Sequence, residues 1–144
     1  LGGGEIISID HDPEFADKTR KDLTRHDLAR WADVRVAERR SSAYLDDTTG
    51  QPVEWYDTDV VDSLPGDIDL VIVDGPPGSA HPFARYPALP ALAQRLSANA
   101  TLVLDDADRP GEQATLARWQ HEFQGMALVF EATEKGAAVL TASP

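Results

Sequence analysis

The chain has 144 residues, of which 42% are hydrophobic and 26% are charged, a composition typical of one globular domain. Cysteine is absent, which excludes disulfides, thiolate nucleophiles and cysteine-ligated zinc. The formal net charge of −12 repels phosphate backbones and anionic membrane surfaces, so we expect neither nucleic acid nor a membrane as partner. No apolar run approaches the roughly 20 residues that a membrane span requires. With no secretory signal at Leu1, we expect a single cytoplasmic domain over residues 1–144.

The first third of the chain predicts a strand, a helix and a second strand. Residues 5–10 are an apolar run that ends in an acid, as buried parallel strands often do, and glycines 2–4 before it indicate a turn. Asp12 offers a helix N-cap and Pro13 a first helical position. The spacing of the following residues predicts a helix that runs to about Arg30, with a short strand over residues 34–37.

The middle of the chain is less regular until a strong strand appears. Residues 47–52 form a turn cluster, and residues 53–56 are typical of a hairpin's return arm or a short edge strand. Residues 68–74 are apolar and β-branched, and this strand stops at the sequence DGPPG. Leu89, Leu92 and Leu96 then indicate a helix.

The last third predicts a strand, a helix and a terminal hairpin. Residues 101–106 form a buried strand that ends in acids, and Leu116, Trp119 and Phe123 define one face of the next helix. Residues 126–132 and 137–142 form two strands whose short connection allows only antiparallel pairing. Alternating strands and helices predict an α/β domain with a mostly parallel sheet covered on both faces.

Acidic residues end three of the predicted strands, where open α/β sheets bind their ligands. Asp10 fits the acid that takes the ribose hydroxyls of a bound nucleotide, although it also fits a loop acid. The stiff loop after Asp74 can hold that carboxylate in a fixed direction, or it can simply end the strand. Asp105 and Asp106, together with Asp74, form either an oxygen site for Mg²⁺ or an acid cluster at a helix start.

Four other side chains have two interpretations each. Arg85 can grip a carboxylate or the amino-acid end of a cofactor, or it can pair with the neighbouring acids. Trp55 and Tyr56 can wall a ligand pocket or pack in the core. His81 is either a base or an exposed loop residue.

These motifs resemble the class I S-adenosylmethionine-dependent methyltransferases, and most closely their small-molecule O-methyltransferase branch. The matching segments are residues 7–13, 69–77 and 102–106 together with the terminal hairpin, which separates this fold from dehydrogenases. The resemblance implies a Rossmann-like fold with S-adenosylmethionine as cofactor. It places Asp10, His11, Asp74, Gly75 and Pro76 at the cofactor, and Asp74 with Arg85 at the methyl acceptor. It also implies Asp74, Asp105 and Asp106 as ligands of Mg²⁺ or another divalent cation, although Ala107 stands where such enzymes often have Asn.

The family's first strand and its glycine loop have no counterpart in this sequence. In the family's sheet that strand lies between those at residues 5–10 and 68–74. We therefore expect these two strands to be separated by a slot, and direct pairing between Ile7 and Val71 would contradict this. The hypothesis is methyl transfer to a small molecule, with a nicotinamide-dependent oxidoreductase or a non-catalytic scaffold of the same fold as alternatives.

Overall fold

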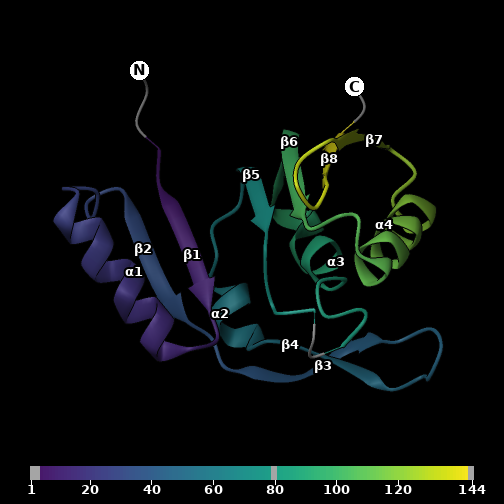
Figure 1. Ribbon diagram of the computed structural model, residues 1–144, viewed down its shortest axis with the longest axis horizontal. Coiled ribbons are helices and arrows are strands. Elements are labelled where there is room, and N and C mark those ends of the chain that lie inside the picture. The colour runs from purple at the N-terminus through teal and green to yellow at the C-terminus, as the bar shows by residue number, and fades with distance from the viewer. Residues whose placement is uncertain (1–3, 79–80, 143–144) are drawn as a thin grey trace.

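The computed structural model describes residues 4–78 and 81–142, which form an α/β arrangement of three small sheets (Figure 1). Two of the glycines predicted to form an opening turn, Gly2 and Gly3, lie outside these ranges. Within the described ranges, no helix combines the length and apolar character needed to cross a bilayer.

The first unit is β1 (Ile6–Asp10), α1 (Pro13–Arg25) and β2 (Ala32–Val36), with β1 and β2 paired in parallel. The predicted start of the helix is confirmed, because the Asp12 carboxylate accepts a hydrogen bond of 2.8 Å from the Glu14 backbone N–H. The end was predicted too late. The helix stops at Arg25, because Asp27 takes a left-handed conformation with φ of 57°.

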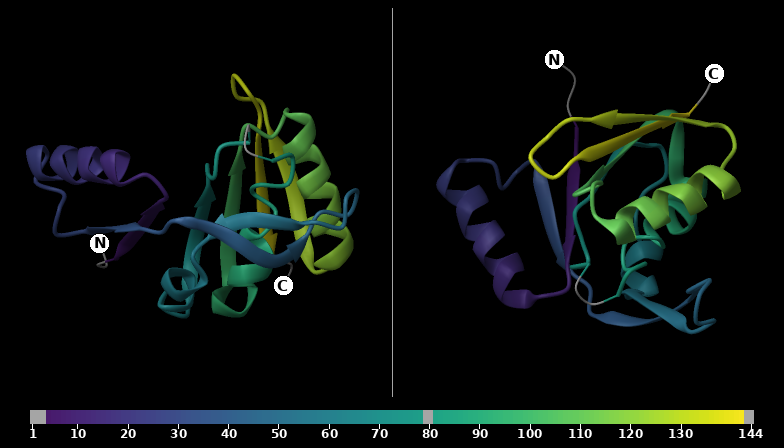
Figure 2. Two further views of the ribbon diagram at one scale, coloured as in Figure 1. Left: turned by 90° about the horizontal axis from the view of Figure 1, so that it is seen from below. Right: turned by 45° about the vertical axis from the view of Figure 1, so that its right-hand side comes forward.

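An antiparallel hairpin follows, formed by β3 (Arg39–Leu45) and β4 (Pro52–Tyr56) and succeeded by the short helix α2 (Thr58–Asp62). The return arm predicted at residues 53–56 is confirmed as part of β4. The hairpin runs across the structure below the carboxyl ends of β1 and β5 (Figures 1 and 2). It therefore crosses the edge at which an α/β fold binds its ligands.

The largest sheet contains β5 (Ile68–Val73), β6 (Leu96–Asp105), β8 (Ala137–Ala142) and β7 (Met126–Glu131), in that order. β5 and β6 are parallel, whereas β8 pairs antiparallel with both β6 and β7, which confirms the terminal hairpin. The helices that pack with it are α3 (Ala88–Leu92), extended by a 3-10 turn (Ala93–Arg95), and α4 (Pro110–Glu122). The prediction that Leu96 is helical was wrong, because the chain becomes extended at Leu96 and enters β6.

The main core covers only one face of this sheet, so the prediction of two covered faces was wrong. Leu102 and Leu104 on β6 are buried beside Leu89 of α3 and Trp119 of α4. The opposite face carries a cross-strand row formed by Ile72, Val103, Val139 and Val129. Ile72 in this row is 67% exposed and Val129 is 54% exposed. Both helices after β5 pack on the same side, which leaves the other side uncovered in the described structure.

β1 and β5 belong to different sheets, and among the described residues no ladder joins them. Pairing between Ile7 and Val71, which would have contradicted the predicted slot, is thus absent from the described pairs. The two strands still share a layer of side chains. Ile7 and Ile9 of β1, and Val71 of β5, pack against the small cluster of Val61, Leu64 and Leu92. The facing backbone edges of β1 and β5 are therefore open, while one side of the space between them is lined by apolar groups.

Candidate functional site

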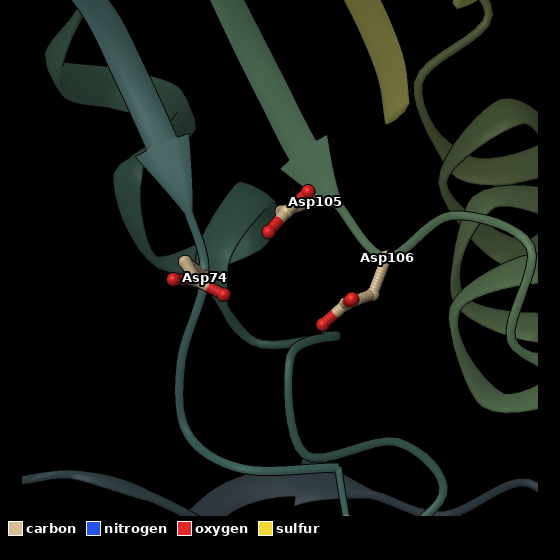
Figure 3. Close-up of side chains that lie close together, drawn as sticks. All are labelled: Asp74, Asp105 and Asp106. Atoms are coloured by element: carbon tan, nitrogen blue, oxygen red, sulfur yellow. The ribbon is translucent and has the colours of Figure 1, made fainter. Parts of the chain in front are cut away.

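Three carboxylates meet where β5 and β6 end, as the sequence predicted. Asp74 follows β5, Asp105 is the last residue of β6, and Asp106 comes directly after it (Figure 3). One oxygen from each lies within 4.8 Å of the others. Because the two strands are parallel and adjacent, their carboxyl ends share one edge, and this brings the acids together.

Asp74 is the accessible member of this group. Its side chain is 69% exposed, so a small molecule can reach the carboxylate. The pKa of Asp74 is raised, first by partial loss of solvent and then by the negative charges of Asp105 and Asp106, while Arg85 opposes the rise. A carboxylate with a raised pKa is a better proton acceptor than an ordinary one.

Arg85 lies beneath the acids and is only 4% exposed. Its Nη1 donates to the Asp105 carbonyl at 2.8 Å, and its Nη2 donates to the Asp74 carbonyl at 2.9 Å. The same Nη2 contacts the Asp74 and Asp106 carboxylates, each at 3.3 Å. Of the two interpretations of Arg85, its contacts correspond to pairing with neighbouring acids. The guanidinium ties the ends of β5 and β6 together.

Asp106 and Glu112 complete the buried part of the site. Asp106 has a φ of 56°, and its carboxylate lies 2.8 Å from Arg109 Nη1 and 3.8 Å from Lys135 Nζ. Glu112, on α4, is 4% exposed, and its Oε1 lies 3.5 Å from Arg85 Nε. Burial raises the pKa of Glu112, although Arg85 and Arg109 act in the opposite direction. Sequence reasoning did not place Glu112 in the site, because an acid in the first turn of a helix is common and Glu112 lies far along the chain from Arg85.

Asp10 ends β1 at the same edge of the fold. Its Oδ1 accepts a hydrogen bond of 2.9 Å from the Asp12 backbone N–H and lies 3.4 Å from His11 Nδ1. The turn into α1 thereby fixes one carboxylate oxygen. Among the described residues no hydrogen bond or ion pair engages Oδ2, and the carboxylate remains partly exposed.

Tyr56, the last residue of β4, lies beside the loop that follows β5 and near enough to Asp10 and Asp74 to be affected by both charges. Its hydroxyl approaches Gly75 so closely that a Cβ at that position would stand 2.5 Å from the oxygen. Burial and the charges of Asp10 and Asp74 raise the pKa of Tyr56 to about 12, so the hydroxyl is a neutral donor. Of the aromatic pair, Trp55 is buried in the core with 5% of its surface exposed. Tyr56 packs against both the main core cluster and the small cluster of Val61, Leu64 and Leu92.

The far end of the hairpin is tied to the rest of the molecule. His81 Nε2 lies 3.1 Å from the Asp46 carboxylate, and its Nδ1 accepts a hydrogen bond from the Phe83 backbone N–H. Both ring nitrogens are thus engaged, which argues against His81 as a base. Arg118 of α4 donates to the Leu45 carbonyl at 2.7 Å and stacks on the Tyr86 ring. The hairpin is anchored at its tip as well as at its base.

A surface hollow of about 520 Å³ lies away from these acids, lined by Thr24, Asp27, Ala29 and Arg30. α1 runs antiparallel to β1, so this hollow is at the amino edge of the unit. Ligands of α/β folds bind at the opposite edge. We therefore place the candidate site at the acids.

Several solved structures with a similar arrangement are methyltransferases. A methyltransferase from Geobacter sulfurreducens matches 97% of this chain and 59% of its own, with a TM-score of 0.64 and 16% identity. The chain shares the fold of this methyltransferase. The SAH-bound Podospora anserina methyltransferase (13% identity, TM-score 0.68) matches 97% of this chain and 61% of its own. An O-methyltransferase from Bacillus cereus in complex with SAH (10% identity, TM-score 0.67) matches 99% of this chain and 64% of its own.

The methyltransferase fold is established here by structure alone. No protein-family model matches the sequence, and no curated protein matches it closely enough to count as a relative. The chain spans about three-fifths of the length of the solved methyltransferases described above. What those proteins bind or modify is therefore a starting point for a proposal.

Proposed function

We propose that this protein transfers a methyl group from S-adenosylmethionine to a small molecule, most readily at oxygen. The observation that carries the proposal is the placement of Asp10 and Asp74 at the carboxyl ends of β1 and β5, with the Tyr56 hydroxyl near enough for both charges to raise its pKa. Neighbours with bound SAH support the same cofactor.

In this proposal Asp10 binds the cofactor's ribose. One of its oxygens is already held by the Asp12 N–H, which orients the carboxylate so that the other can accept from a ribose hydroxyl. His11 lies beside the cofactor, and Gly75 and Pro76 line it from the loop that follows β5.

Asp74 assists removal of the acceptor's proton. Its carboxylate is accessible, and its raised pKa improves it as a proton acceptor. We propose Arg85 as a positioning residue for the reaction, because it holds both the carbonyl and the carboxylate of Asp74 from below. S-adenosylmethionine would supply the methyl group and leave as S-adenosylhomocysteine, while Asp74 would take the acceptor's proton and the fold would align the acceptor oxygen.

The open edges of β1 and β5 bear on this proposal. A cofactor held at Asp10, with the acceptor at Asp74, needs backbone donors and a glycine-rich turn between the two acids, as phosphate- and nucleotide-binding loops provide. We propose that in the active protein one further parallel strand with such a turn occupies the slot. Unpaired backbone groups in a core cost about 1–3 kcal/mol each, which favours a filled slot.

The test combines cofactor binding with methyl transfer to a panel of phenols, catechols and sugars, read by mass spectrometry. We expect Asp74→Asn to lose most activity while the affinity for S-adenosylhomocysteine stays within about twofold, because Asp74 acts on the acceptor. Asp33→Asn, which removes an exposed acid on β2, is the matched control. Activity of Asp74→Asn equal to that of the control would contradict the role of Asp74.

A non-catalytic scaffold is the second candidate, and the open strand edges are the observation that favours it. It predicts that S-adenosylhomocysteine produces no shift in melting temperature at any concentration. An oxidoreductase would instead bind NAD, and the antiparallel terminal hairpin disfavours it. Parallel titrations with the two ligands separate these alternatives.

A further inference from the structure

The cluster of acidic side chains at the ends of β5 and β6 is paired with basic side chains of the same protein. Arg85, Arg109 and Lys135 all contact the Asp106 carboxylate, at 3.3, 2.8 and 3.8 Å. Arg85 also pairs with Asp74 at 3.3 Å and with Glu112 at 3.5 Å. The four acids Asp74, Asp105, Asp106 and Glu112 thus share three basic groups, all of which contact Asp106.

A divalent cation would have to compete with these contacts. Mg²⁺ requires carboxylate oxygens that can turn toward it with near-ideal octahedral geometry. Asp106 Oδ2 accepts from Arg85 Nη2 and lies 2.8 Å from Arg109 Nη1, and Asp106 is 5% exposed. Its Oδ1 lies 3.8 Å from Lys135 Nζ, so both oxygens already face basic groups, and the set of Asp74, Asp105 and Asp106 does not fit a three-carboxylate metal site.

Arg85 cannot easily leave this position. Its nitrogens donate to three backbone carbonyls, of Asp74, Pro76 and Asp105, in addition to the carboxylates. Arginine remains charged whatever the pH, and its fork of donors matches oxygens in fixed directions. Since the carbonyls belong to the residues that end β5 and β6, the guanidinium sets the spacing of the same residues that would ligate a metal.

We infer that the guanidinium of Arg85 takes the place of a divalent cation in this site, so that its acids are organised without a metal. The inference deepens the proposed function, because it assigns that reaction to the metal-independent class. Its test measures metal binding directly, and so it can fail or succeed whether or not the protein proves to be a methyltransferase.

The experiment titrates Mn²⁺, a paramagnetic probe for Mg²⁺ sites, and measures free Mn²⁺ by electron paramagnetic resonance. Wild-type protein should bind no Mn²⁺ with a Kd below about 1 mM, the weak end of protein sites for hard cations. Arg109→Gln removes an exposed partner of Asp106 and should tighten binding at least fivefold. Arg25→Gln makes the same charge change at the end of α1 and should leave binding unchanged.

A second variant addresses Arg85 itself. Arg85→Met leaves the acids without their buried cation, and Mn²⁺ should raise its melting temperature while that of the wild type stays constant. If Arg85→Met does not fold, the Arg109→Gln titration decides. The inference is overturned if the wild type binds one Mn²⁺ per chain with a Kd below about 1 mM and Asp106→Asn abolishes it. It is equally overturned if neither Arg85→Met nor Arg109→Gln gains Mn²⁺ affinity over the wild type.

Discussion

The hydroxyl of Tyr56 occupies the space that a side chain at residue 75 would fill. A Cβ on Gly75 would lie 2.5 Å from the hydroxyl oxygen but 3.8 Å from the ring carbon that carries it. Only the oxygen conflicts with a larger residue. The loop after β5 and the end of β4 are therefore fitted to each other through one atom.

This fit predicts a strong coupling between the two residues. Gly75→Ala should lower the free energy of unfolding by about 1–3 kcal/mol, the usual cost of overpacking. Tyr56→Phe in the same chain should restore most of that loss, because the offending oxygen is gone. Urea unfolding of the two single variants and the double variant measures the coupling. Additive effects would show that the loop and the hairpin move apart freely.

Asp10 should contribute to cofactor affinity and little else. We expect Asp10→Asn to weaken binding of S-adenosylhomocysteine by about 1.5–3 kcal/mol, the range for a hydrogen bond to a charged group. Calorimetry measures the change, with Asp33→Asn as the control on the neighbouring strand. An affinity equal to that of the control would remove Asp10 from the site.

The acids of this site could be predicted from sequence, but their surroundings could not. Asp10, Asp74, Asp105 and Asp106 follow apolar runs, and the rule that parallel strands end at one edge brings Asp74, Asp105 and Asp106 together. Tyr56 comes to the site because its hairpin crosses below the strands. That path depends on contacts such as the one between Arg118 and the Leu45 carbonyl, 73 residues apart. No local pattern encodes such a contact.

The same limit explains the uncovered face of the sheet. The apolar character of residues 68–73 predicted a strand buried on both sides, and Leu70 is nevertheless 55% exposed and Ile72 67% exposed. An apolar pattern indicates that side chains are covered in the folded protein, but it does not say which segment covers them. For these two side chains the described residues do not provide one.

The open edges of β1 and β5 predict an uneven pattern of amide hydrogen exchange. β6 and β8 each have a neighbour on both sides, so their amides should be the slowest to exchange. Alternate amides of β5 and β1, on the sides away from β6 and β2, should exchange at least about tenfold faster, because nothing in the described structure bonds them. Uniform protection across β5 would show that its open edge is paired in solution.

The pair formed by Tyr86 and Glu122 predicts a pH-dependent stability. Burial alone would raise the pKa of Glu122, but hydrogen bonds from Tyr86 (2.6 Å) and Arg118 outweigh it and lower the pKa below 4.5. A lowered folded-state pKa stabilises the protein above about pH 4.5, and this contribution is lost as the pH falls through the folded value. Wild type should thus exceed Tyr86→Phe by about 1 kcal/mol at pH 7 and by less in acid.

Urea unfolding from pH 3 to pH 7 measures this difference. The control repeats the comparison in a Glu122→Gln background, where residue 122 does not titrate and the effect of Tyr86→Phe should be independent of pH. A difference between wild type and Tyr86→Phe that is constant across the range would contradict the assignment to Glu122.

The unequal division of the core has a consequence for how this protein would hold a ligand. All buried residues of the main hydrophobic cluster come from Trp55 or later in the chain. β1 contacts the rest of the protein through Ile7 and Ile9, which pack against the small cluster of Val61, Leu64 and Leu92. Asp10 therefore stands on the unit with the weakest anchorage, which can open without unfolding the large sheet. A molecule bound to Asp10 and Asp74 together must also keep that unit docked. Its measured affinity would then contain the free energy of docking, and each change that loosens Ile7 or Ile9 would weaken binding without touching the ligand.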